Sequence, residues 1–353
     1  MKSKRSRLAF SDNGPSVTIL VGGQYGSEGK GCIAGYLAPE HDVIVRVGAP
    51  NAGHTLKMGD SKWKMRQLPV AGLVNPDCVM LIGAAGLINL EVLKTEMGYI
   101  KGIEGRLFID RNAGILEPHH IKEEEEGKMN ASIGSTCEGV GAALKHKISR
   151  GKDFRTAKDV PELAPYIINV SEYINKLPQD KSVFIEGTQG YSLSLNHGPY
   201  PFCTGRDVIA SSMLSDIGLS PFFCDDIIMV VRTYPIRVAG NSGPMLDEID
   251  WPTVTKEAGY PSELQEKTTV TKRIRRVGRF DMDQVIEAVK VNRPTQLALT
   301  FIDYISYEDK GKTEYDDLTV KSKAFINMIE DKTGVPVNLI KTGIEYDDIV
   351  DRR

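Results

Sequence analysis

The residue of this chain with the clearest chemical potential is Lys30, which lies in the glycine-rich stretch Gly22–Gly31, with the sequence GGQYGSEGKG. Closely spaced glycines let backbone N–H groups approach phosphate oxygens, and a helix that begins beside them adds positive potential. Five residues separate Gly23 from Gly29, and Gly31 follows the lysine where an ordinary phosphate loop has Ser or Thr. We interpret the stretch as a phosphate-binding loop, and the alternative is a plain strand-to-helix turn.

Two further polar side chains come directly after apolar runs that read as strands. His54 stands in Asn51-Ala-Gly-His-Thr55, after the run 43–47, and Gln189 stands in Glu186-Gly-Thr-Gln-Gly190, after the run 183–186. Open α/β sheets bind ligands at the carboxyl ends of their strands. We therefore expect both side chains at a ligand site, where the Gln189 amide can hold a base or carbonyl edge. The alternative for His54 is a structural imidazole.

Two polar segments later in the chain are candidate anion sites. The Gly/Ser/Thr-rich stretch 133–141 resembles a second oxyanion-binding loop, and its alternative is a flexible surface loop. The stretch 268–276 combines hydroxyl groups with arginines, which bind carboxylates and phosphates in a bidentate way. Its alternative is a solvated basic loop. A nucleic-acid surface is not expected there, because no aromatic residues alternate with the cations.

One pair of histidines invites a metal site, but we do not predict one. His119 and His120 are adjacent in the chain, and we expect their side chains to diverge. The acidic run 123–126 that follows them is expected to be the solvated face of a helix.

The elements that must position these residues form an alternating series. Strands are predicted at 17–21, 43–47, 79–82, 107–109, 183–186, 227–232, 296–300 and 337–340, and helices near 90–97, 207–215, 282–291 and 324–332, with Asp281 as the N-cap of the third. This alternation predicts an α/β fold with a mostly parallel central sheet flanked by helices. We expect a basic N-terminal tail over 1–16 and a single domain over 17–353.

Composition limits the classes of function. The 353 residues are 41% hydrophobic and 26% charged, with a net charge of -3, so no global basic field points to nucleic acid. No run of about 18 apolar residues indicates a membrane span. The five scattered cysteines form no Cys-x-x-Cys pair, which favours reduced thiols and a cytoplasmic location. From the residues alone, we expect a nucleotide-binding ligase or kinase, and the rival class is a nucleoside-triphosphate-operated switch.

Five motifs in order resemble adenylosuccinate synthetase. They are the glycine-rich loop, Asn51–Thr55, Glu186–Gly190, Tyr200-Pro-Phe-Cys-Thr204 and the Arg273–Arg276 cluster, and the resemblance runs from about residue 17 to 343. It implies a P-loop-like nucleotide-binding fold of that family. It also implies a ligase in which a nucleoside triphosphate phosphorylates the 6-oxygen of a purine nucleotide and the aspartate amine then displaces phosphate.

The resemblance also implies roles for single residues. The catalytic groups would be Ser27, Lys30, His54 and Gln189, and the purine nucleotide would contact Ser27, Asn51, Thr136, Arg150, Gln189, Thr204 and Val238. The triphosphate would contact Ser27, Gly29, Lys30, Gly31, Cys32, Gly53, His54, Thr55, Asp303 and Gly343. Aspartate would contact Val270, Thr271, Arg273 and Arg275, and Mg²⁺ would contact Ser27 and the Gly53 carbonyl. Arg150 would reach the nucleotide of a partner subunit, which implies a homodimer.

Ser27 departs from the family pattern, in which Asp at this position takes the proton from purine N1 and helps to bind Mg²⁺. A serine hydroxyl is a poor proton acceptor without an activating neighbour. Serine is also shorter than aspartate and leaves room for the 2-amino group of guanine. The pattern resembles the phage branch of the family, which acts on dGMP and makes the precursor of 2-aminoadenine for phage DNA. The expected location is then the host cytoplasm, and the in-family alternative is an ordinary synthetase that uses IMP and GTP.

The donor-binding segment departs as well. The family reads GTP with Thr-Lys-x-Asp, and this chain has Thr300-Phe-Ile-Asp303, in which Phe301 replaces the lysine that packs over guanine. This replacement favours ATP as the donor, with dATP also possible, while the retained Asp303 leaves GTP as an alternative.

Overall fold

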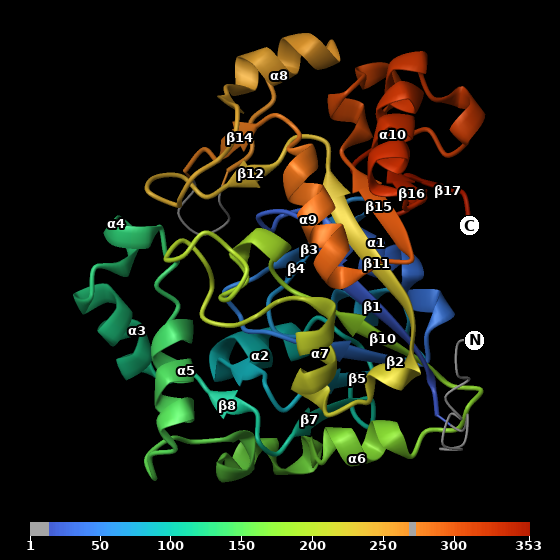
Figure 1. The fold of residues 1–353 in the computed structure, drawn as a ribbon. Coiled ribbons are helices and arrows are strands. Elements are labelled where there is room, and N and C mark those ends of the chain that lie inside the picture. Colours follow the sequence, from blue (N-terminus) through green and yellow to red (C-terminus); the bar gives the residue numbers. More distant parts are fainter. Residues whose placement is uncertain (1–13, 268–272) are drawn as a thin grey trace, which may run out of the picture.

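The computed structural model describes residues 14–267 and 273–353, and its centre is a ten-stranded sheet (Figure 1). The strand order is β17-β16-β15-β11-β1-β10-β2-β5-β7-β9. The strands are β1 (Ser16–Gly22), β2 (Val43–Arg46), β5 (Val79–Ile82), β7 (Leu107–Asp110), β9 (Ile167–Ile168), β10 (Ser182–Glu186), β11 (Cys224–Arg232), β15 (Gln296–Thr300), β16 (Val337–Lys341) and β17 (Ile349–Asp351). All pairs are parallel except β16 with β17, so the predicted mostly parallel sheet is confirmed.

The central strand β1 explains why the sheet is covered on both faces. Ile19 and Val21 belong to one apolar core, and Leu20 belongs to the core on the other face. Because successive side chains of a strand point to opposite faces, a continuous apolar run requires cover on both sides. β1 lies between β10 and β11, so the loop that follows β1 starts between the ends of those two strands.

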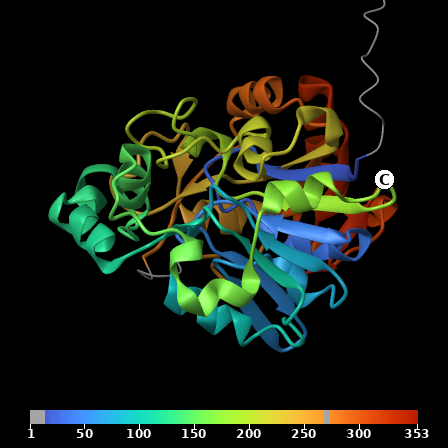
Figure 2. The same cartoon turned by 90° about the horizontal axis from the view of Figure 1, so that it is seen from below.

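The helices supply that cover, and in the view from below they lie on both sides of the strands (Figure 2). They are α1 (Lys30–Leu37), α2 (Leu90–Met97), α3 (Pro118–Glu126), α4 (Met129–Ile133), α5 (Val140–Ser149), α6 (Val170–Asn175), α7 (Ala210–Ile217), α8 (Trp251–Ala258), α9 (Met282–Asn292) and α10 (Val320–Thr333). Both views place α3, α4 and α5 together at one side of the molecule.

Helix boundaries follow side-chain caps. The predicted cap Asp281 is confirmed, because its carboxylate accepts the N–H of Gln284 at 3.0 Å. α10 begins earlier than predicted because Thr319 caps it and accepts the N–H of Ser322. α7 begins later than predicted, since the carboxylate of Asp207 is bonded to Ser194 instead of to a helix terminus.

Short antiparallel strands form two additions that the sequence did not predict. β3 (His54–Met58) and β4 (Ser61–Met65) form a hairpin directly after the Asn51 motif. β12 (Ile236–Arg237), β13 (Glu248–Ile249) and β14 (Arg276–Gly278) form a three-stranded sheet. The parallel pair β6 (Leu87–Ile88) and β8 (Gly114–Ile115) lies apart from both. Among the described residues, no helix is long and apolar enough to cross a membrane.

Candidate active site

The glycine-rich loop between β1 and α1 is tied to two neighbouring strands. The buried amide of Gln24 donates to the carbonyl oxygen of Arg232 at 3.1 Å and accepts the Arg232 N–H at 2.8 Å. The hydroxyl of Thr300 donates to the carbonyl oxygen of Glu28 at 2.7 Å. These bonds hold the loop against the carboxyl ends of β11 and β15, at the sheet edge where ligands bind in such folds.

Lys30 points back toward a carboxylate inside the loop. Its Nζ lies 2.5 Å from Oε2 of Glu28, and both side chains are buried. Oε1 of Glu28 accepts the N–H groups of Gln24, at 3.1 Å, and Gly26, at 2.8 Å. The loop therefore carries an internal anion in contact with Lys30 and two loop N–H groups. A phosphate bound at this lysine has to compete with Glu28 for it.

Two glycines explain how the Asn51 and Glu186 motifs reach the loop. A Cβ on Gly31 would lie 2.8 Å from the carbonyl oxygen of Thr55, and a Cβ on Gly22 would lie 2.5 Å from that of Gln189. Only glycine permits such close backbone approach. Gly31 therefore replaces the usual Ser or Thr because β3 packs directly on the N-terminus of α1. The structure thus brings the backbone of Thr55 and of Gln189 to the glycine-rich loop.

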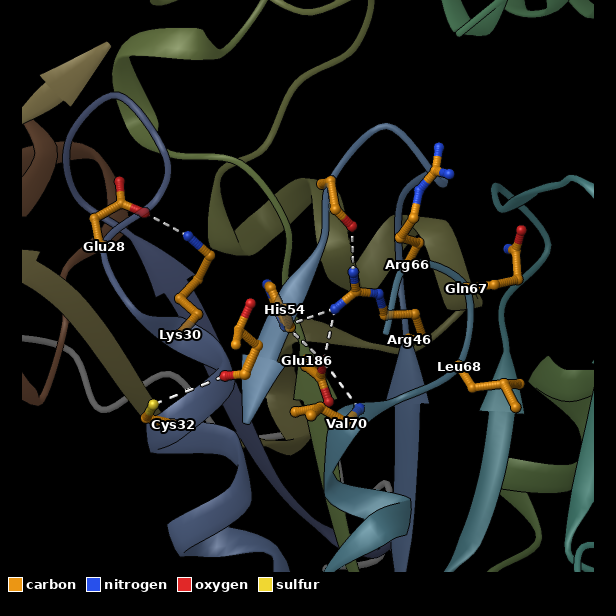
Figure 3. Close-up of polar contacts among 12 residues, drawn as sticks. Glu28, Lys30, Cys32, Arg46, His54, Arg66, Gln67, Leu68, Val70 and Glu186 are labelled. Carbon is orange, nitrogen blue, oxygen red and sulfur yellow. Dashed lines mark hydrogen bonds and ion pairs between the residues drawn. The ribbon is translucent and has the colours of Figure 1, made fainter. Parts of the chain in front are cut away.

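His54 forms a buried triad with Arg46 and Glu186 (Figure 3). Nδ1 of His54 lies 2.6 Å from Oε1 of Glu186 and 2.6 Å from Nη1 of Arg46, and that Nη1 donates to the same Oε1 at 2.6 Å. The second Arg46 nitrogen donates to the carbonyl oxygen of Ala52 at 2.8 Å. The triad fixes the imidazole ring through Nδ1, which leaves Nε2 as the nitrogen for a ligand.

Burial and the neighbouring charges determine the protonation state of His54. Burial, followed by the positive charge of Arg46, lowers the pKa of His54 to about 4, so the imidazole is neutral near pH 7. Burial alone raises the pKa of Glu186, but His54 and Arg46 outweigh it and hold that pKa below its usual range. Arg46 and Glu186 were not assigned roles from the sequence. The signal for both was a charged residue at the end of an otherwise apolar strand.

Ser27 is reached by the arginine cluster that was expected to bind aspartate. Nη1 of Arg275 donates to Oγ of Ser27 at 2.8 Å, and Nη1 of Arg232 donates to the Ser27 carbonyl oxygen at 3.0 Å. Burial lowers the pKa of Arg275, yet a guanidinium stays charged at neutral pH. Arg273 is exposed two residues earlier. Of the other predicted aspartate contacts, Val270 and Thr271 lie outside the described residues.

Loops from the second half of the chain border the same region. The guanidinium of Arg237 lies 4.5 Å from the ring centre of Tyr25 and donates to the carbonyl oxygen of Phe202 at 3.1 Å. These contacts place the segments of Thr204 and Val238 beside the glycine-rich loop. Thr204 is itself held by its N–H, which donates to the carbonyl oxygen of Leu193 at 2.7 Å. Cys203, next to Thr204, has its pKa raised by burial.

The stretch 133–141 differs from the predicted oxyanion loop. The carboxylate of Glu124 accepts the N–H groups of Gly139, at 2.9 Å, Gly141, at 2.7 Å, and Ala142, at 3.3 Å. The protein's own anion thus holds the N-terminus of α5, and Glu124 is buried instead of lying on a solvated face. Thr136 is exposed in this loop and takes no part in the hydrogen bonds to Glu124.

The loop of Thr136 still borders the site. A Cβ on Gly134 would lie 3.0 Å from Ser242, and the Ser242 hydroxyl donates to the carbonyl oxygen of Val238 at 2.6 Å. Arg150, by contrast, is exposed at the far end of α5. That helix has 10 residues, about 15 Å at the usual rise, so Arg150 is remote from Thr136 within one chain.

The segment Thr300–Asp303, which was expected to contact the base of the nucleoside triphosphate, lies beside the glycine-rich loop. A Cβ on Gly29 would lie 3.5 Å from the ring of Phe301, and the Arg232 guanidinium lies 4.0 Å from the centre of that ring. Asp303 is buried, accepts the hydroxyl of Tyr260, and has its pKa raised to about 6 by burial. The carboxylate that would read a guanine is therefore already occupied.

The remaining predicted contacts surround the loop on the side of β3 and β16. Asn51 and the exposed Gly53 lie in the turn before β3, and Gly53 leaves space for the Lys64 side chain. The thiol of Cys32 contacts the carbonyl oxygen of Thr55 at 3.7 Å, and burial raises its pKa. Gly343 follows β16, and its carbonyl oxygen accepts Nζ of Lys341 at 2.5 Å.

Comparison with known proteins agrees with this arrangement. The family model of adenylosuccinate synthetase matches residues 19–158 and 154–312. The adenylosuccinate synthetase of Pyrococcus sp. (strain ST700) is 40% identical over 342 residues, which cover 95% of this chain and 98% of that protein. The adenylosuccinate synthetase of Methanocaldococcus jannaschii is 39% identical, over 95% of this chain and 96% of that protein.

Two solved structures have the same fold. The succinoaminodeoxyadenylate synthetase of cyanophage S-2L, bound to dGMP and to dATP as an energy donor, superposes with a TM-score of 0.80 at 29% identity, over 96% of both chains. The fully ligated adenylosuccinate synthetase of Plasmodium falciparum gives a TM-score of 0.84 at 21% identity, over 96% of this chain and 100% of that one. With its glycine-rich loop, His54 triad and arginine cluster at one sheet edge, this chain belongs to the adenylosuccinate synthetase family of C–N ligases.

Proposed function

We propose that this protein joins L-aspartate to C6 of dGMP, with ATP as the phosphate donor, to give N6-succino-2-amino-2'-deoxyadenylate. The observation that carries the proposal is Ser27, whose short neutral side chain is held by Arg275 in the phosphate-binding loop. Guanine differs from hypoxanthine by an amino group on C2, next to N1. A hydroxymethyl side chain leaves more room for that group than the longer carboxylate of aspartate would.

A second candidate function is that of an ordinary adenylosuccinate synthetase, which uses IMP. The observation in its favour is that the archaeal relatives at about 40% identity carry that name. The observation in favour of dGMP is the likeness to the cyanophage enzyme at 29% identity. Ser27 supports dGMP on a physical ground, because its short side chain leaves more space beside purine C2.

The proposed reaction has two steps. The γ-phosphoryl group of ATP passes to O6 of the purine as its bond to ADP breaks, and the N1 proton passes to water. The amine of aspartate then attacks C6 and gives up a proton to water, the C6–O bond breaks, and phosphate leaves with its bonding electrons. An oxo group is a poor leaving group and phosphate a better one, so the first step prepares the second.

The residues of the site have distinct parts in these steps. Lys30 and the loop N–H groups bind the transferring phosphoryl, whose charge must outcompete the Glu28 carboxylate. His54 donates to that phosphoryl from Nε2, as the neutral tautomer whose Nδ1 accepts from Nη1 of Arg46. The Gln189 amide, next to the loop, holds the purine edge. Ser27 positions the edge of the base near N1.

Adenylosuccinate synthetases use Mg²⁺ and a nucleoside triphosphate. Two neutral oxygens here, the Gly53 carbonyl and the Ser27 hydroxyl, would be suitable ligands for Mg²⁺. At nucleotide sites, Mg²⁺ is otherwise bound mainly by phosphate oxygens and water. Arg275 already donates to Ser27, so the Gly53 carbonyl is the better ligand. When bound, Mg²⁺ neutralises charge on the triphosphate.

ATP is favoured over GTP by the state of Asp303. A carboxylate recognises guanine by accepting from N1–H and the 2-amino group. Asp303 already accepts from Tyr260 through one carboxylate oxygen, which leaves a single oxygen for the two guanine donors. Adenine offers no such pair of donors and loses nothing at this position.

Arg150 is the residue on which we base the proposal of a homodimer. It is exposed at the end of α5 that is remote from its own Thr136 loop. In the proposed homodimer, Arg150 contacts the nucleotide phosphate of the partner subunit.

A single substitution in the glycine-rich loop tests the proposal. Ser27→Asp should lower kcat/KM for dGMP and raise it for IMP, so the ratio of the two should shift by at least about tenfold, the equivalent of 1.4 kcal/mol. The matched control is Ser211→Asp at an exposed position in the first turn of α7, which should leave the ratio unchanged because that side chain lies outside the site. An unchanged ratio in Ser27→Asp would refute the steric role of Ser27.

A further inference from the structure

Three histidines from two helices meet outside the active site. His119 and His120 lie in the first turn of α3, and His146 lies in the last turn of α5. One ring nitrogen from each lies within 4.8 Å of the others. The expectation that the adjacent pair diverges was wrong, because the two ring centres are 4.0 Å apart. The packing of α3 on α5 turns both rings toward His146.

His120 is the buried member of this histidine cluster. Its side chain is 1% exposed, and Nδ1 accepts the N–H of Glu117 at 3.0 Å. Nε2 has no hydrogen-bond partner within the described structure. Buried polar groups are rarely left unpaired, so the Nε2 position lacks a ligand that the fold itself does not supply.

We propose that His119, His120 and His146 bind one divalent transition-metal ion, with Zn²⁺ as the best match. Neutral imidazole nitrogens are preferred ligands for Zn²⁺, and three of them with a water complete a tetrahedral site. Mg²⁺ prefers oxygen ligands, so this ion is distinct from the Mg²⁺ that accompanies the nucleotide.

The surrounding groups suit such an ion. The carboxylate of Glu123 lies 3.2 Å from Nε2 of His146, and it can hold that ring while Nδ1 binds the metal, as carboxylates commonly do behind metal-bound histidines. Ligands of a tetrahedral zinc lie about 3.3 Å apart, given bonds of about 2.0 Å. The site therefore closes slightly on binding, and the exposed His119 and half-buried His146 can move.

His120 changes tautomer when the ion binds at Nε2. The hydrogen bond from Glu117 places the ring proton on Nε2 in the metal-free protein. The proton moves to Nδ1, so the backbone N–H of Glu117 gives up its bond to His120 in the α3 capping box. No proton is released from this ring, so His120 remains a neutral ligand throughout.

The ion would connect the two helices that flank the Thr136 loop. Glu124 already holds α3 to the N-terminus of α5 through its bonds to Gly139 and Gly141. The histidine cluster lies at the opposite end of both helices. A metal there would fix α3 and α5 at two points and hold in place the loop that faces the predicted purine site.

The experiment is calorimetric titration of the full-length chain, without a histidine affinity tag, with Zn²⁺ and with Mg²⁺. We expect one Zn²⁺ per chain and no Mg²⁺ at this site. His119→Asn and His146→Asn should each weaken Zn²⁺ binding by at least about tenfold, since even groups behind the ligands contribute 10–100-fold. His197→Asn, at an exposed histidine outside the cluster, should bind Zn²⁺ as the wild type does.

Thermal melting supplies a second readout and tests folding. Without metal, His119→Asn should melt with the wild type, because its side chain is exposed. Zn²⁺ should raise the melting temperature of the wild type and of His197→Asn but not of His119→Asn. The proposal is overturned if the wild type takes up no Zn²⁺, or if the His119 and His146 variants bind it with unchanged affinity, which would place the ion on cysteines.

Discussion

Replacement of Glu186 by glutamine should damage the site in two separable ways. The substitution keeps the shape of the side chain and removes its charge from a pocket that it shares with Arg46 and His54. Arg46 is 3% exposed and Glu186 fully buried, so no water replaces the lost partner. The variant leaves a buried guanidinium without its counter-charge and an imidazole without its carboxylate.

The magnitude follows from the burial of the pair. Removing one partner of a buried ion pair costs about 3–5 kcal/mol, and we expect the lower half of that range because Arg46 keeps its bond to Ala52. Loss of the negative charge also lowers the pKa of His54 further, since Glu186 is what raises it. The phosphoryl-transfer step should slow by about 10²-fold or more, the usual contribution of a positioned acid or base.

Urea denaturation and steady-state kinetics measure the two effects. The free energy of unfolding should fall by about 3 kcal/mol, and kcat should fall while KM for aspartate changes little. Glu248→Gln is the matched control, because Glu248 pairs with Arg276 at an exposed surface where the loss should be at most about 1 kcal/mol. A Glu186→Gln enzyme with wild-type kcat would refute the role of the triad in catalysis. A loss of unfolding free energy below 1 kcal/mol would refute the claim that the Arg46–Glu186 ion pair is a buried, stabilising contact.

Two further predictions concern the donor and pH. Tyr260→Phe frees Asp303, and it should raise kcat/KM for GTP relative to ATP by about tenfold, the worth of one charge-assisted hydrogen bond. An unchanged GTP/ATP ratio would show that Asp303 does not face the donor base. The pKa of His54 is about 4 in the folded protein and 6.5 in the unfolded chain, so between these pH values only the unfolded chain binds the proton. Stability should therefore fall as pH drops through this window, by up to about 3 kcal/mol in urea titrations. His54→Gln should lose that part of the acid sensitivity, and a variant with the full wild-type slope would contradict the pKa assignment.

The sheet was predictable because its strands are apolar runs that alternate with helices. β1, β5 and β15 begin and end within one residue of their predicted ranges. The short strands β3, β4 and β12 to β14 were missed, since they are polar pieces that depend on tertiary contacts. Caps such as Thr319 moved helix boundaries by a few residues.

The candidate site was predictable at the level of motifs and not of partners. Lys30 and His54 were identified as reactive groups, but the carboxylates that hold them were not. Glu186 is 140 residues from Arg46 and 132 from His54, and no local pattern records such a pairing. The Arg275 bond to Ser27 spans 248 residues and likewise appears only when β14 returns to the loop.

The histidine cluster is a case in which the sequence led us to reject a site that the structure assembles. Spacing along the chain argued against a metal at His119 and His120, because a third ligand 26 residues away was not visible. Contact between α3 and α5 supplies His146 and brings the three rings together. A sequence pattern therefore underestimates a site whose members lie on different elements.

The most direct test of the proposed substrate is the mass of the product. The wild-type protein is incubated with aspartate, Mg²⁺ and ATP, and with either dGMP or IMP. The proposal predicts a succinylated nucleotide from dGMP, with one phosphate released per product, and little or none from IMP. A succinylated product from IMP alone would contradict it and assign the protein to ordinary adenylosuccinate synthesis. Phosphate release without any adduct would contradict the ligase mechanism for both nucleotides.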